Sequence, residues 1–472
     1  MEYSIVNYKV VRTITDDFRF DADYFKPKYL KEDRQRAHYE NICIRDFCHV
    51  TDGQHGYHEV DEDSPIFHLT AKNAKGWFAN TDGADRLAKW VDDKNKRSSL
   101  KEKDLILSTR GTVGFCALVM KEALPANIDQ DVARIAINSR SEIEPEFLLA
   151  YLNCTFGQDW LMRNVSGMVQ QGLPLDKVRN IPIPLLAKDF QNSCKKIVEL
   201  GYRTFRNSEV LYEKAEQILL SELGLLNWKP KHRLSFVKNF SDTATAGRVD
   251  AEYFQPKYDD VVERIKQYKE GYKQLGKIVK VKNKNFKPKD DVIYRYIELA
   301  NISSYGNING FIEAVGKELP TRARRKVNEG DVIVSTIEGS LSSIALITKE
   351  LDNALCSTGF FVVHSEKINS ETLLVLLKSQ VGQLQLKKGC SGTILTAIGE
   401  DEFKKIILPD MPSWIQGEIK KKITEMYKAK ALSKRLLDIA KRGVEMAIEQ
   451  DEKTAEKWIR DEVNEMGVEL DT

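Results

Sequence analysis

Two stretches of the chain, residues 189–224 and 413–448, share one pattern of apolar and small side chains. Alternating steps of four and three residues from Phe190, or from Ile415, meet such a side chain almost every time, although the second series also passes through Lys422. A repeat of 3.5 residues predicts two long helices that pair with a left-handed twist, and small residues let them approach closely. Two amphipathic helices, each packed on its own domain, would give a similar pattern. The positions expected to pair are Ile197, Leu211, Ala215, Ile218, Ile419, Met426, Leu436 and Ala440.

Elsewhere the pattern changes to short apolar, β-branched runs separated by glycine and asparagine, which predicts short strands with turns. Short helices are expected at about 145–154 and 370–378. Each is expected to lead through a glycine-containing loop to a strand flanked by proline. The expected strands lie at 105–108, 132–137, 181–184, 332–335, 360–363 and 406–409.

The elements recur because the chain contains one unit twice. An Asp-Ala-acid-Tyr-Phe segment begins at Asp21 and again at Asp250, an offset of 229. Residues 104–109 return as 331–336, an offset of 227, and the Gly-Gln pair at 157–158 returns after 225 residues. Chance matches would not keep their order, and a period this long indicates a duplicated domain rather than a solenoid.

The duplication predicts four parts in a mixed α+β protein with two similar α/β domains. The first domain is expected over 1–185 and the first long helix within 186–228. The second domain is expected over 229–410, and the second long helix with an acidic C-terminal tail over 411–472.

Composition fits a folded protein with a highly charged surface, because 42% of the 472 residues are hydrophobic and 30% are charged. We expect no membrane span, since no apolar run approaches ~18 residues. No secretory signal is visible, and the seven cysteines include no Cys-x-x-Cys pair, so reduced thiols in the cytoplasm are expected.

Charge is balanced in total but not along the chain. The net charge is only +2, yet residues 273–289 carry seven lysines and no acid. A second basic cluster spans 322–326, whereas residues 444–472 carry ten acids against three bases. Such runs indicate either a solvated face or a surface that binds nucleic acid.

The enzyme motifs that we tested are incomplete. Gly271 to Lys277 has the spacing of a phosphate loop, but Ile278 supplies no hydroxyl for magnesium. Asp410, Glu418 and Lys420 imitate a nuclease metal site, although the last two fall in the second long helix. No Asn/Asp-Pro-Pro-aromatic segment or Gly-x-Gly-x-x-Gly motif is present, and the histidines and cysteines near residue 50 have irregular spacing for zinc. The pattern favours a binding protein over a catalyst, with no metal site.

The order of the repeated motifs resembles the specificity subunit of type I restriction-modification systems. The resemblance covers nearly the whole chain, in both halves. The second unit departs from the family pattern at 336–339, where an arginine is replaced and one residue inserted, and Gln54 departs within the first. The motifs that carry it are Thr51-Asp-Gly-Gln-His55, Lys103 to Gly114, Phe147 to Asn153, Ser166-Gly167 and Leu175 to Pro184.

The resemblance implies two target recognition domains, each reading one half of a bipartite site in double-stranded DNA. It implies that the two long helices run antiparallel as a coiled-coil spacer. Two methyltransferase subunits would dock on the helices and restriction-translocase subunits would join them. The partners would use S-adenosylmethionine, ATP and magnesium, and this chain would bind no cofactor and perform no catalysis.

DNA contacts are expected in loops, where Arg, Asn, Gln, Ser and Thr can reach base edges and lysines can reach phosphates. The candidates in the first unit are His55, Tyr57, Arg110, Thr112, Gln170 and Gln171. The candidates in the second unit are Lys282, Lys284, Lys287, Arg324, Arg325, Thr393 and Thr396.

Two other functions stay open at this point. A self-contained nuclease or methyltransferase would act on DNA without a partner. A helical scaffold that binds only proteins would retain no duplex DNA even at low salt.

Overall fold

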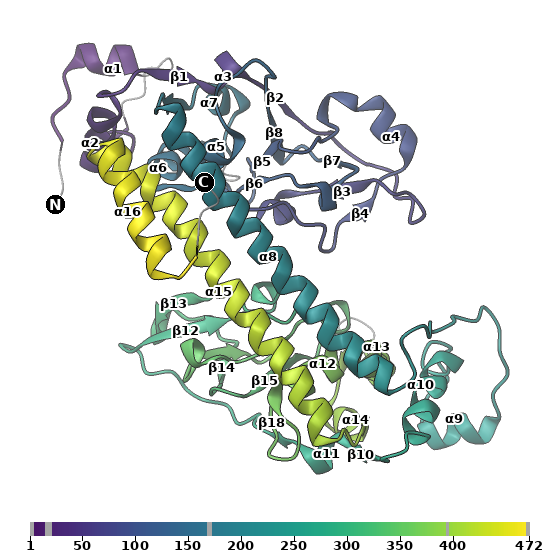
Figure 1. The fold of residues 1–472 in the computed structure, drawn as a ribbon. Coiled ribbons are helices and arrows are strands. Elements are labelled where there is room, and N and C mark those ends of the chain that lie inside the picture. The colour runs from purple at the N-terminus through teal and green to yellow at the C-terminus, as the bar shows by residue number, and fades with distance from the viewer. Residues whose placement is uncertain (1–3, 15–20, 168–171, 393–395, 469–472) are drawn as a thin grey trace. The chain divides into compact units, whose positions relative to one another are not determined.

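The computed structural model describes residues 4–14, 21–167, 172–392 and 396–468 (Figure 1). The chain forms two compact units, the first from residues 1–205 and 430–472 and the second from 206–429. Two long helices, α8 (Lys188–Glu222) and α15 (Ser413–Glu449), each contribute one segment to both units. The first unit is therefore built from two separate pieces of the sequence, whereas the second is one continuous piece.

The first unit combines small sheets with helices, of which α5 is buried in the core. Its elements, besides the long helices, are α1 (Tyr8–Ile14), α2 (Pro27–Arg36), β1 (Asn41–Cys43), α3 (Ile44–Phe47), β2 (Cys48–Asp52), β3 (Phe67–Leu69), β4 (Asp85–Arg86), α4 (Lys89–Lys94), β5 (Leu105–Ser108), β6 (Cys116–Leu118), β7 (Ala126–Ile128), β8 (Val132–Ile137), α5 (Pro145–Asn153), α6 (Thr155–Arg163), α7 (Leu175–Arg179), β9 (Pro182–Pro184) and α16 (Glu452–Glu465).

The second unit follows the same order. Its elements are α9 (Phe240–Ala246), α10 (Pro256–Lys266), β10 (Tyr272–Gln274), α11 (Leu275–Ile278), β11 (Lys280–Val281), β12 (Ile293–Ile297), β13 (Ile312–Val315), β14 (Ala323–Lys326), β15 (Val332–Ser335), β16 (Ile344–Leu346), β17 (Leu355–Ser357), β18 (Phe360–His364), α12 (Ser370–Lys378), α13 (Gln380–Lys388), β19 (Cys390–Ser391), β20 (Ala397–Ile398), α14 (Glu400–Lys405) and β21 (Ile407–Pro409).

Sheet topology confirms the internal duplication. An antiparallel sheet of order β2-β8-β5-β6 in the first unit corresponds to β11-β18-β15-β16 in the second. A second sheet joins β3 to β7 in parallel, as β12 is joined to β17, and a two-stranded ribbon pairs β1 with β9, as β10 pairs with β21. The second unit adds the strand β14 beside β17.

The strands expected at 105–108, 132–137 and 332–335 are confirmed residue for residue, and the helices expected near 145 and 370 are confirmed as α5 and α12. The loop expected directly after each of them is wrong, because a second helix, α6 or α13, begins two residues later. A glycine near the start of α6 explains why the second helix can begin so soon. A Cβ on Gly157 would lie 2.2 Å from the carbonyl oxygen of Tyr151, so this glycine lets α6 start against the end of α5.

Gln158 follows Gly157, and Gln383 follows the equivalent Gly382; the two glutamines make equivalent hydrogen bonds. Gln158 Nε2 donates to the carbonyl oxygens of Leu152, at 2.7 Å, and Gly114, at 2.8 Å. Gln383 Nε2 donates to those of Leu377 and Leu341, at 3.0 and 3.1 Å. The repeated Gly-Gln pair thus ties the helix junction to the loop that follows β5 or β15.

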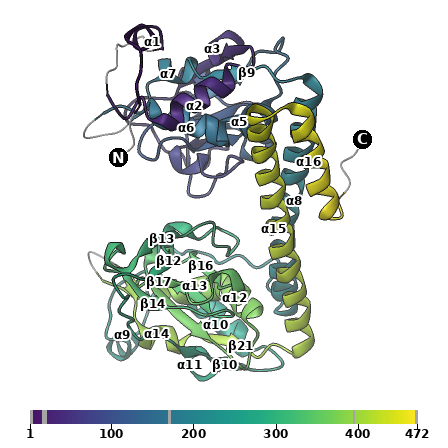
Figure 2. The ribbon, with the colours of Figure 1, turned by 90° about the vertical axis from the view of Figure 1, so that its left-hand side faces the viewer.

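The long helices pack against each other within each unit, and both views show them side by side (Figures 1 and 2). Ser433 Oγ donates to the Gly201 carbonyl at 2.7 Å, and a Cβ on Gly201 would lie 3.0 Å from Leu437 Cδ2. α8 runs from the first unit into the second while α15 runs the opposite way, so the pair is antiparallel, as expected.

Most seam positions lie inside the two cores. Lys422 is an exception, because its ammonium pairs with Glu425 at 3.0 Å while the neighbouring Ile423 is buried, and Ile218 is only half-buried. The buried members in the first unit are Ile197, Leu436 and Ala440, and those in the second are Leu211, Ala215, Ile419 and Met426.

The acidic C-terminal run contains a packed helix that its charge did not reveal. Asp451 caps α16 by accepting from Thr454 N at 2.9 Å. The helix buries Ala455, Ile459 and Val463 in the core of the first unit. Along the described segments, no helix is both long and apolar enough for a bilayer.

Replacing Gly157 by alanine should lower the free energy of unfolding by roughly 1–3 kcal/mol or more, because the new Cβ would overlap backbone atoms that cannot move aside. Gly417 is a matched control in α15, since an added Cβ there meets no atom within 4 Å. Gly417→Ala should stabilise the chain by about 0.5–1 kcal/mol. Urea unfolding of both variants checks this, and equal effects would disprove the close approach of α5 and α6.

Candidate nucleic-acid interface

Three loops of the first unit meet at one edge of its four-stranded sheet. β2 and β5 end beside the start of β8, since both pair antiparallel with it. Gly53 N donates to the Asp129 carbonyl at 3.1 Å, and Thr109 N donates to that of Asp131 at 2.8 Å. Leu173 N donates to the Thr109 carbonyl at 2.8 Å, which brings the end of a further loop to the same place. Loop segments more than 100 residues apart in sequence, at Gly53 and Leu173, thereby meet at one sheet edge.

Gly53 has a steric role in the Thr-Asp-Gly-Gln-His segment. A Cβ at this position would lie 1.8 Å from the carbonyl oxygen of Ile128. Any other residue would push the loop after β2 away from β8. The glycine therefore places the following side chains, including His55 and Tyr57, at the sheet edge.

The basic side chains at this edge have acidic neighbours. His55 Nε2 lies 2.8 Å from Asp52 Oδ2, and Arg110 Nη1 lies 3.7 Å from Asp131 Oδ1. Burial raises the pKa of the nearby Asp129 carboxyl to about 6. Tyr57 is 89% exposed, and Thr112 is exposed with its carbonyl bound to Ser108 Oγ. The surface of the first unit thus offers mixed charge and an open aromatic ring.

The lysine run of the second unit occupies the equivalent place. In the first unit, Ile135 of β8 pairs with Val50 on one side and with Leu105 on the other. In the second unit, Val363 of β18 pairs in the same way with Val281 and Val332. Val50 and Val281 are therefore equivalent positions. The residues that follow Val281 form the counterpart of the loop that holds His55 and Tyr57.

The two basic runs of the second unit lie side by side. Phe286 N donates to the Arg324 carbonyl at 2.7 Å, and Asn285 forms a β-bridge with Arg325. Lys284 and Lys287 are exposed on this segment. Arg324 Nε donates to the Thr321 carbonyl at 2.9 Å. The structure thus assembles Lys284, Lys287, Arg324 and Arg325, which come from runs about forty residues apart.

Lys282 has a different environment from its neighbours. Its ammonium lies 2.7 Å from Asp331 Oδ2, and Asp331 is fully buried. In the first unit Arg134 Nε serves the equivalent carboxylate, Asp104, also at 2.7 Å. Lys282 therefore neutralises a buried acid of the fold, which the sequence run alone could not distinguish from a solvated lysine.

Arg325 is the least satisfied cation of this cluster. Its Nε and Nη1 atoms are buried and have no hydrogen-bond partner in the described part of the chain. Burial lowers the pKa of this guanidinium from its usual value, against the weaker opposing effects of Cys356 and Glu400.

The hairpin candidates are only partly visible. Gln170, Gln171 and Thr393 lie outside the described residues. Thr396 is half-buried; its Oγ1 donates to the Gly392 carbonyl at 3.3 Å, and its own carbonyl accepts from Glu338 N at 3.0 Å. The second hairpin thus joins the loop after β15, as the first joins the loop after β5 through Arg110 and Gly172.

The residues of the nuclease alternative have other partners. Asp410 Oδ2 pairs with Lys273 at 2.5 Å, and Lys420 Nζ lies 3.8 Å from Glu371. Among the residues with assigned structure, no group of three or more His, Cys, Asp or Glu is arranged to hold a metal ion. Of the histidines near residue 50, His49 and His55 are exposed, whereas the rings of His58 and His68 lie 3.9 Å apart. Burial lowers the pKa of His68 to about 4.

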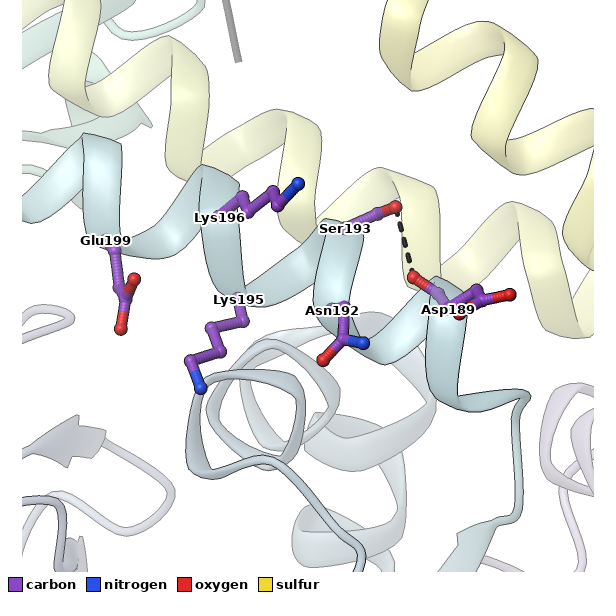
Figure 3. Close-up of a pocket in the computed structure, with 6 residues that line it drawn as sticks. All are labelled: Asp189, Asn192, Ser193, Lys195, Lys196 and Glu199. Carbon is purple, nitrogen blue, oxygen red and sulfur yellow. Dashed lines mark hydrogen bonds between the residues drawn. The ribbon is translucent and has the colours of Figure 1, made fainter. Parts of the chain in front are cut away.

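A polar groove of about 510 Å³ lies along the start of α8, away from these loops (Figure 3). Two of its four charged side chains are paired with residues outside the groove, since Lys195 lies 3.0 Å from Glu144 and Glu199 lies 3.0 Å from Lys103. The groove therefore presents no free charge of these two residues to a substrate. The residues that line it are Asp189, Asn192, Ser193, Lys195, Lys196 and Glu199.

Lys282→Ala should lower the free energy of unfolding by about 3 kcal/mol, because it leaves the buried Asp331 carboxylate without its cation. Lys284→Ala removes the same charge from an exposed position and should change it by less than about 0.5 kcal/mol. Unfolding both variants in urea checks the assignment. Equal midpoints would mean that Lys282 is a solvated lysine.

Comparisons with known proteins give one sequence relative and several structures. No family model matches the chain. A segment of 114 residues is 28% identical to the specificity subunit of the type I restriction enzyme EcoBI of Escherichia coli. This match spans 24% of that relative's length and 24% of this chain.

Solved structures of low similarity were also found. The type I S subunit of M. genitalium gives a TM-score of 0.37 at 12% identity, covering 87% of this chain and 95% of that one. The HsdS subunit of Thermoanaerobacter tengcongensis gives 0.27 at 13% identity, covering 88% and 97%. The sequence match agrees with the order of the repeated motifs: the chain resembles the specificity subunits of type I restriction-modification systems.

Proposed function

We propose that this chain is the non-catalytic DNA-specificity subunit of a type I restriction-modification complex. The observation that carries the proposal is the repeated loop edge. Both units place the loop after β2 or β11, the loop after β5 or β15, and a hairpin on the same sheet topology, but with different side chains. Two domains with the same fold but different loop side chains would be able to recognise two different half-sites of DNA.

Each unit would read DNA with a division of labour among its side chains. In the second unit, exposed Lys284 and Lys287 suit phosphates, which fix position without specifying sequence. In the first unit, Arg110 and Thr112 have the donors and acceptors that base edges require, and the exposed Tyr57 ring can make apolar contact. Gln170, Gln171, Thr393 and Thr396 are further candidates for base contact.

The antiparallel helix pair would serve as the spacer between the half-sites. Half-site spacing follows from the separation of two rigid readers, and a packed helix pair holds a distance better than a flexible linker. In the proposed complex two methyltransferase subunits dock on α8 and α15, and restriction-translocase subunits join them. Those partners would use S-adenosylmethionine, ATP and magnesium, and this chain would bind none of them.

Exchanging residues 1–180 for the equivalent segment of another specificity subunit should change one half of the methylated site and leave the other half intact. The reason is that the first loop edge is built entirely from this segment. Sequencing methylated adenines in a host that carries the whole system checks the result. A change in both halves would contradict independent readers.

Inserting one heptad into both long helices, after Phe205 and after Ala429, should lengthen the gap between half-sites by about three base pairs. Seven helical residues add about 10 Å, and a heptad preserves the seam. As a control, the same seven residues inserted beside the fully exposed Leu234 should leave the gap unchanged. The methylated sites report both outcomes, and an unchanged gap in the double insertion would remove the spacer from the proposal.

A further inference from the structure

The guanidinium of Arg325 stands out among the cations of the second unit. Two of its three nitrogens, Nε and Nη1, are buried without a hydrogen-bond partner among the described residues. Both atoms are shielded from solvent, and no acceptor in the described part of the chain lies within hydrogen-bond distance of them. A charged donor taken out of water without an acceptor destabilises the state that contains it.

Both oxygens of Glu400, the acid that acts electrostatically on Arg325, have other partners. Glu400 Oε2 accepts from Asn283 Nδ2 at 2.9 Å, and Glu400 Oε1 lies 2.6 Å from Lys404 Nζ. The carboxylate that raises the pKa of Arg325 from a distance therefore leaves the guanidinium without a direct contact.

The surroundings of Arg325 point to a polyanion as the missing partner. Arg325 lies on β14, a strand that the first unit's described sheet lacks, and it pairs there with Asn285. Exposed Lys284 and Lys287 lie on that neighbouring segment, and Lys326 is exposed next to it in sequence. Exposed, flexible lysines suit phosphates, whereas a guanidinium fork suits a fixed pair of acceptors.

We propose that Arg325 reads a guanine in the half-site of the second unit, by donating two N–H groups to the O6 and N7 acceptors on its major-groove edge. The inference rests on the proposed function and adds the residue and the base. A fork contact uses two adjacent donors, so at least one of the buried nitrogens becomes accessible in the complex. The relief of the unpaired state then favours binding to DNA that carries the acceptor pair over DNA that lacks it.

The first test is the stability of the full chain without DNA. Arg325→Leu removes the unpaired donors and should raise the midpoint of thermal unfolding by about 2–4 °C. Arg324→Leu is the matched control, because the guanidinium of Arg324 already donates to the Thr321 carbonyl. This substitution should not raise the midpoint. A lower midpoint for Arg325→Leu would show that the guanidinium stabilises the free chain, which overturns the inference.

The second test uses the complex with its methyltransferase subunits and the site mapped by wild-type methylation. Duplexes carry 7-deazaguanine, which lacks the N7 acceptor, at one guanine of the half-site at a time. Wild-type affinity should fall about tenfold at one of these positions. Arg325→Leu and Arg325→Gln should bind the unmodified site about tenfold more weakly than wild type and lose no further affinity at that position.

Other outcomes are equally decisive. A loss that is equal on every duplex, with a shallower dependence on salt, would make Arg325 a phosphate contact and overturn the base assignment. Unchanged affinity in both variants would remove Arg325 from the interface. A wild-type complex that binds no duplex would instead contradict the proposed function. If the wild-type complex binds its site and only the predicted Arg325 effects are missing, the inference fails while the proposed function stands.

Discussion

The packing of α8 against α15 constrains every other part of this chain, because both units take part of their core from both helices. In the first unit, Gly201 lets α8 approach Leu437 and accepts a hydrogen bond from Ser433 across the seam. In the second, Tyr212 and Ala215 share a core with Ile419 and Met426. The helices thus complete the units rather than merely connect them. A change in the seam therefore acts on the stability of both units as well as on the packing of the helix pair.

The two units preserve one framework while they exchange its charged parts. Each buries an aspartate at the start of the strand β5 or β15, but Arg134 of β8 neutralises the first and Lys282 neutralises the second from the loop after β11. The Gly-Gln junction, by contrast, keeps both its residues and its hydrogen bonds. The helix junction that a Cβ would disrupt stays fixed, whereas the ion pair is supplied from different elements. This difference explains why the loops can diverge without loss of the fold.

Sequence patterns predicted the elements whose signal is local. The apolar runs gave the central strands, the 3.5-residue repeat gave the long helices, and the collinear motifs gave the duplication. Three features depended on distant partners and were missed. Gly157 marks a close helix junction, which composition cannot distinguish from a loop. The acidic run hides the apolar face of α16. The carboxylate beside Lys282 and the missing acceptor of Arg325 arise only when β14 and β15 come together with residues 282–286.

The net charge of +2 conceals a difference between the two loop edges. In the first unit, Asp52 and Asp131 lie beside the cations that DNA would approach, so part of any phosphate attraction is cancelled locally. In the second, Lys284 and Lys287 have no carboxylate within ion-pair distance among the described residues, and two buried nitrogens of Arg325 have no acceptor there. Phosphate neutralisation governs the dependence of affinity on salt. Under the proposed function, the second unit would therefore supply most of the salt-dependent affinity, and recognition by the first would depend more on hydrogen bonds and contact with its exposed Tyr57.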